Sequence, residues 1–105
     1  MTGHLRAYEM LLVAVGVLAT GETSIQERLH AALSEFHVLD PEDFPSDETR
    51  HKFAVVMEHL DVADSERGTV PESLKGLSSH EASNLARRVF DLFIDVASAR
   101  YQEAA

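Results

Sequence analysis

Two Glu-x-x-His segments are the part of this sequence whose residue types and spacing come closest to a chemical site. Glu27 precedes His30 by three residues, and Glu48 precedes His51 by the same step. Residues three apart on a helix lie on one face, so each pair offers a carboxylate oxygen and an imidazole nitrogen to one metal ion. Two such pairs facing each other inside a bundle of helices would form a two-metal site.

This pairing resembles the metal box of ferritin-like di-iron proteins, and the resemblance covers eight residues. However, both motifs open consecutive helices, and antiparallel neighbours put their starts at opposite ends of a bundle. Glu27 is also expected to cap its own helix, while His30 and His51 fall off the faces that we expect to be buried. We therefore expect no metal ion and no other cofactor.

A second short motif lies at Leu74-Lys75-Gly76. It is similar to the end of the histidine-phosphotransfer motif, in which a phosphorylated histidine precedes Leu-Lys-Gly on a long helix. Here the histidine position is Glu72, Pro71 comes directly before it, and Gly76 marks a helix boundary. The sequence also contains neither a glycine-rich phosphate loop nor an elbow-type turn that would expose a serine nucleophile. We therefore expect the protein not to be an enzyme.

Composition narrows the class of protein further. The chain has 105 residues with 18 acidic and 9 basic side chains, a formal charge of −9, which disfavours direct binding to nucleic acid. It has no cysteine, which excludes disulfides and thiolate metal sites and favours a reducing compartment. The apolar run over residues 10–19 is about half the ~20 residues of a bilayer span. We expect a cytoplasmic protein with one helical domain over residues 1–105.

Caps and apolar periodicity predict an all-α chain. Gly21 gives a stop signal, and Ser24 and Glu27 form a capping box just after it. Ser78 and Glu81 form a second capping box near the C-terminal third. The expected helices cover residues 3–19, 25–39, 47–60 and 79–102, with short helical turns near 41–44 and 71–75 and a polar loop over 61–69. This order predicts a compact four-helix, bundle-like domain.

The first and last helices carry more apolar surface than one buried face requires. On the last helix, one apolar line consists of Leu85, Val89, Leu92 and Val96. A second line, about 100° away, consists of Phe90, Ile94, Ala97 and Tyr101. A peripheral bundle helix needs about 100° of apolar arc, and both terminal helices offer about twice that. Either these helices are central, or the second line forms an interface with a partner or a second copy, which we favour.

An acidic cluster is the other surface feature, at the corner between the second and third helices. It consists of Asp40, Glu42, Asp43, Asp47 and Glu48. On a rigid fold, such carboxylates can imitate the phosphates of DNA and occupy a nucleic-acid-binding protein. The alternative is that they cap helix starts and solvate a loop, which we favour because several stand where the helix dipole stabilises negative charge.

The segment Ser-Ile-Gln-Glu-Arg-Leu at 24–29 followed by Pro-Glu-Asp-Phe-Pro at 41–45 resembles small uncharacterised bacterial helical proteins, which implies no activity. Our first hypothesis is a non-enzymatic interaction or regulatory module that binds a protein partner, or a second copy as a homodimer, through its excess apolar faces. The alternatives are an acidic DNA-mimic inhibitor and, third, a metal protein or enzyme.

Overall fold

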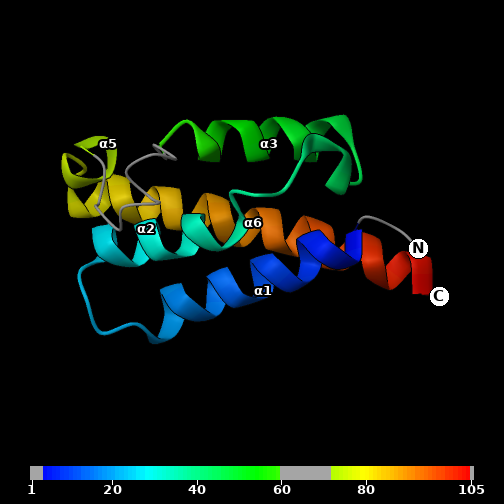
Figure 1. Cartoon of the computed structure of the whole chain (residues 1–105), viewed down its shortest axis with the longest axis horizontal. Coiled ribbons are helices and arrows are strands. Elements are labelled where there is room, and N and C mark those ends of the chain that lie inside the picture. The colour runs from blue at the N-terminus through cyan, green and yellow to red at the C-terminus, as the bar shows by residue number, and fades with distance from the viewer. Residues whose placement is uncertain (1–3, 60–71, 105) are drawn as a thin grey trace.

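The computed structural model describes residues 4–59 and 72–104, which form helices joined by short connections (Figure 1). The helices are α1 (His4–Thr20), α2 (Ile25–Phe36), the 3-10 turn η1 (Pro41–Asp43), α3 (Asp47–Met57), α5 (Glu72–Lys75) and α6 (Ser79–Ala104). The predicted all-α, bundle-like fold is confirmed for these residues. The polar loop expected over 61–69 lies outside the described residues. No helix in the described ranges is long and apolar enough to cross a membrane.

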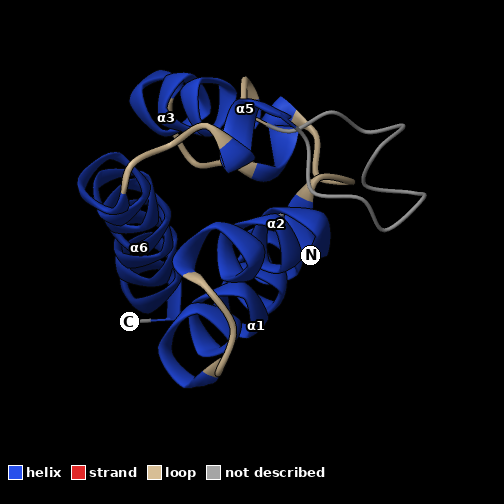
Figure 2. Ribbon diagram, turned by 90° about the vertical axis from the view of Figure 1, so that its left-hand side faces the viewer, coloured by secondary structure: helices blue, strands red, loops and turns tan. Residues whose placement is uncertain are grey.

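The longest helix, α6, organises the bundle. Its 26 residues correspond to about 39 Å of helix, close to the 41 Å length of the whole molecule. It contacts α1, α2 and α3, and α1 also contacts α2. Figure 2, viewed along the long axis, shows α1 and α3 at opposite corners with α6 and α2 between them. The beginning of α1 and the end of α6 lie at the same end of the molecule (Figure 1), so these two helices are antiparallel.

A buried cluster of apolar side chains fills the space between the described helices. Its largest fully buried side chains are Phe36, Phe44, Leu11, Leu29, Leu33, Leu74, Leu92, Val56, Val89 and Val96. Phe53 joins the aromatic members, with its ring centroid 4.5 Å from that of Phe44 and 6.2 Å from that of Phe36. Because each of the described α-helices contributes to this cluster, burial of apolar surface fixes the arrangement on which any functional surface depends.

Polar contacts close the junction between α1 and α2. The Ser24 hydroxyl accepts a hydrogen bond from the Glu27 amide at 3.1 Å, as the sequence predicts, but the Glu27 carboxylate accepts no return bond from the Ser24 amide among the described residues. Arg28 makes two further hydrogen bonds at this junction, in which its guanidinium donates to the Leu18 carbonyl at 2.7 Å and to the Thr23 carbonyl at 3.0 Å. The Leu18 carbonyl, one of the last of α1, is thereby satisfied by a side chain of α2.

Two helices end earlier than the sequence predicts. α2 ends at Phe36 and α3 at Met57, where we expected residues 39 and 60. After α2 the backbone makes a tighter turn than an α-helix, in which the Leu39 amide donates a hydrogen bond to the Phe36 carbonyl, three residues earlier. Asp40 then becomes extended, with φ −102° and ψ 158°, as the residue before a proline prefers.

His30 is a further correction, since we expected it off the buried face and it is only 8% exposed. The reason lies in tertiary packing: α5 contacts α2, and Lys75 of α5 lies beside His30 in a shallow depression. The His30 Nε2 atom is buried and has no hydrogen-bond partner in the described part of the chain. The amphipathic pattern of α2 alone does not indicate this contact with α5, so His30 looks exposed from sequence.

Candidate functional site: an exposed apolar stripe and an adjoining pocket

The second apolar line of α6 lies on the surface. Phe90 is 47% exposed, Ile94 is 42% exposed, Tyr101 is 77% exposed, and Ala97 between them is half-buried. These residues follow one another at steps of four, three and four, so they share one face of the helix. We call this set the α6 stripe. It is the surface that the sequence analysis singled out as a candidate interface.

Contacts on both flanks of α6 explain why the stripe points outward. Toward α1, the Phe93 ring stacks on Tyr8 with centroids 5.7 Å apart, and Arg100 lies 5.0 Å over the same Tyr8 ring. Toward α3, the Lys52 ammonium bonds to the Asp95 carboxylate at 2.6 Å. Part of the excess apolar arc of α6 is therefore internal, and the stripe is the part that α1 and α3 leave uncovered.

One exposed side chain of α1 extends this apolar surface. Leu12, 48% exposed, follows Tyr8 by one helical turn and so lies on the side of α1 that faces α6. Because α1 and α6 are antiparallel (Figure 1), one turn after Tyr8 on α1 corresponds to one turn before Phe93 on α6, which is the turn that contains Phe90. Val13, the next residue, is rotated by about 100° and lies on a different face.

The candidate acidic residues are placed differently from one another. The Asp43 carboxylate accepts a hydrogen bond from the Asp40 amide at 2.8 Å and lies 3.9 Å from Arg6. Asp47 pairs with Arg50 at 2.8 Å, and Glu48 lies 3.7 Å from Lys52. Only Asp40 and Glu42 among the five present carboxylates without a nearby cation in the described part of the chain. These contacts agree with helix capping and local pairing.

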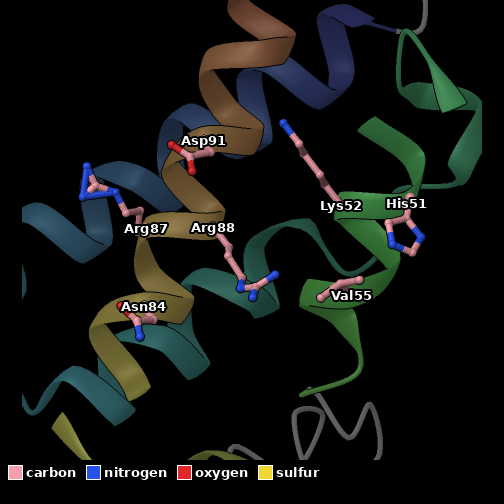
Figure 3. A pocket seen from close by; sticks show the side chains of 7 residues that line it. All are labelled: His51, Lys52, Val55, Asn84, Arg87, Arg88 and Asp91. Carbon is pink, nitrogen blue, oxygen red and sulfur yellow. The ribbon is translucent and has the colours of Figure 1, made fainter. Parts of the chain in front are cut away.

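A pocket of about 420 Å³ separates α3 from α6 on the side next to the stripe. It is lined by His51, Lys52, Val55, Asn84, Arg87, Arg88 and Asp91. Figure 3 shows Lys52 reaching from α3 toward α6 and Arg88 reaching from α6 toward α3, while Arg87 points away from α3. Sequence reasoning missed this site. The signal was Arg87-Arg88, two adjacent arginines in a chain of charge −9.

The electrostatics of this pocket centre on Lys52. Its hydrogen bond to Asp95, together with the attraction of Asp95, Glu48 and Asp91, raises the pKa of the Lys52 ammonium, against a smaller opposing effect of burial. Lys52 therefore remains charged and joins α3 to α6. An ammonium held in this way is a structural cation and not a proton donor at neutral pH.

The two Glu-x-x-His motifs are kept apart. Glu27 and His30 line a depression of about 580 Å³ at the start of α2, whereas His51 lines the pocket between α3 and α6. In the described ranges, no group of three or more His, Cys, Asp or Glu side chains is placed to hold a metal ion. Comparison with protein-family models, curated proteins and solved structures gives no match.

Proposed function

We propose that this chain is a non-enzymatic interaction or regulatory module that self-associates through the α6 stripe. The observation that supports this is the exposure of Phe90, Ile94 and Tyr101 along one line of a rigid helix. Aromatic side chains anchor protein interfaces because they bury a large area at a low cost in conformational entropy. The proposal includes a cytoplasmic location, which the absence of cysteine favours.

The energetic argument begins with Phe90. A phenylalanine that is 47% exposed presents roughly 100 Å² to water, and burying it at about 25 cal/mol per Å² gives roughly 2.5 kcal/mol. Ile94, Tyr101 and the neighbouring Leu12 add further apolar area to the same surface. Such a surface on a helix that is already folded needs little reordering on association, so more of this free energy appears as affinity.

The spacing of the stripe fits a second copy of the same chain. If two α6 helices pack antiparallel about a two-fold axis near Ile94, Phe90 of one copy meets the small Ala97 of the other. The same axis places Arg87 opposite Tyr101, where a guanidinium can lie over the aromatic ring. A symmetric interface of this kind uses each contact twice. Large and small side chains therefore alternate across the proposed contact.

The acidic DNA-mimic alternative receives less support. Arg6, Arg50 and Lys52 lie beside Asp43, Asp47 and Glu48 respectively, so cations interrupt the row of carboxylates that a DNA mimic would present. Direct contact with nucleic acid stays disfavoured for a chain of charge −9.

The absence of cysteine makes this proposal testable by disulfide trapping. Ile94→Cys places one thiol near the proposed two-fold axis, and Val38→Cys is the control, because Val38 is 47% exposed in the connection after α2. Under mild oxidation at micromolar concentration, we expect Ile94→Cys to form disulfide-linked dimers much faster than Val38→Cys, since the two thiols would meet within bonding reach. Equal rates for the two variants would contradict self-association through the stripe.

A further inference from the structure

The arginines in the described part of the chain divide into those that make contacts within the fold and those that do not. The first group makes hydrogen bonds, ion pairs or ring contacts within the fold: Arg6, Arg28, Arg50 and Arg100. In contrast, neither Arg87 nor Arg88 has a hydrogen bond or ion pair within residues 4–59 and 72–104. Both line the pocket between α3 and α6. Two unused guanidinium groups at one pocket suggest a ligand from outside the fold.

The distribution of acids around the pocket keeps Arg88 available. Asp95 bonds to Lys52 at 2.6 Å, and Glu48 lies 3.7 Å from the same ammonium, so these two carboxylates are committed to the lysine. Asp91 lines the pocket but makes no ion pair with either arginine among the described residues. The pocket with its neighbouring acids is therefore close to neutral, on a molecule whose total formal charge is −9.

The hydrogen-bond donors of the pocket that have no acceptor within the described fold are suited to binding an oxyanion. A guanidinium offers two parallel N–H groups to a carboxylate or a phosphate, and it is less strongly hydrated than an ammonium. Figure 3 shows Arg88 reaching into the space between the helices, with Val55 opposite it on α3 and Asn84 one turn earlier on α6. The Asn84 side-chain nitrogen lies 3.4 Å from His80 Nε2, which leaves it a second N–H for a ligand, and Val55 supplies an apolar wall.

We infer that the pocket between α3 and α6 binds the oxyanion group of a small ligand, a phosphate or a carboxylate, with Arg88 as the principal donor and Asn84 as a second donor. Asp91 in the wall disfavours a second anionic group and accepts a hydrogen bond from a hydroxyl or amino group of the ligand. The volume of about 420 Å³ matches a small molecule. This inference does not require self-association, because Arg88 faces α3 whereas the stripe faces solvent.

The test is a titration followed by two-dimensional 1H–15N NMR, with inorganic phosphate and acetate as separate probes at constant ionic strength. We expect saturable shifts of the Arg88 Nε–H signal and of the Asn84 and Val55 amides with at least one probe. Arg88→Gln should weaken binding at least about tenfold, since it removes a charge-assisted bidentate contact. Arg88→Lys keeps the positive charge but lacks the two parallel N–H donors of a guanidinium, so this variant should bind the probes more weakly than the wild type does.

The control is Lys75→Gln, which removes an exposed cation whose only partner in the described chain is the exposed Glu72. It should bind both probes as the wild type does. The same titration on the Phe90→Glu, Ile94→Glu variant should be unchanged, which separates this inference from the proposed function. A lack of saturable shifts with both probes, or shifts that survive Arg88→Gln, would overturn the inference. A Kd for Arg88→Lys equal to that of the wild type would overturn the bidentate contact.

Discussion

At the scale of single residues, the structure separates side chains that the sequence could place from those it could not. Gly21 was recognised as a stop signal, but its tight contact with Arg28 depends on how α2 returns against α1. A Cβ atom at position 21 would lie 2.6 Å from the Arg28 Cδ and 2.9 Å from the Val17 carbonyl oxygen. Spacing along the chain contains no information about such distances, because they arise from the path of the connection in space.

Gly21→Ala is therefore expected to destabilise the protein. The added methyl group must displace the middle of the Arg28 side chain, which breaks its bonds to the Leu18 and Thr23 carbonyls, at a cost of about 1–3 kcal/mol. Gly16→Ala is the matched control: no atom lies within 4 Å of its added Cβ, and it should stabilise α1 by about 0.5–1 kcal/mol. Urea unfolding measures both changes. A Gly21→Ala variant as stable as the wild type would contradict the contact.

At the scale of elements, local signals were sufficient for much of the fold. The box at the start of α6 is complete, because the Ser78 hydroxyl accepts from the Glu81 amide at 3.1 Å and the Glu81 carboxylate accepts from the Ser78 amide at 3.0 Å. These bonds involve residues three apart, so they can be predicted from sequence. The burial of His30 could not be predicted from such local signals, since it depends on the packing of α5 against α2. The end of α2 was predicted three residues too late, although the proline at position 41 is visible in the sequence.

The capping box gives the stability of the protein a defined pH dependence. The hydrogen bonds from the Ser78 backbone and side chain lower the pKa of Glu81 below its ordinary value of 4.5. A lowered pKa in the folded state means that the stabilisation is complete above the unfolded-state pKa and is lost as the pH falls through the folded-state pKa. The advantage of the wild type over Glu81→Ala should therefore be full at neutral pH and should shrink below about pH 4.5.

Glu81→Gln is the control for this expectation, because glutamine keeps an acceptor for the Ser78 amide but does not titrate. Its advantage over Glu81→Ala should stay constant with pH. Urea unfolding at a series of pH values compares the three proteins. A wild-type advantage that is unchanged at acid pH would show that the Glu81 carboxylate does not contribute through the box.

At the scale of the whole molecule, the question is which apolar surfaces the fold covers. The sequence indicated twice the usual apolar arc on the terminal helices, but it could not show how much of that arc becomes internal. The antiparallel contact of α1 with α6 partly buries Phe93 against Tyr8, and α6 leaves Phe90, Ile94 and Tyr101 exposed. The pocket beside Arg88 was equally beyond sequence analysis, because it requires α3 and α6 to meet.

The most direct test of the account is the solution mass, measured by sedimentation equilibrium over a range of concentrations. We expect the wild type to approach twice its 11.6 kDa chain mass, and the Phe90→Glu, Ile94→Glu variant to remain a helical monomer, because two charges would be buried in the interface. Val13→Glu, which adds a charge on a different exposed face of α1, should remain dimeric. A wild type that stays monomeric at every concentration, or a folded double variant that still dimerises, would contradict self-association through the α6 stripe.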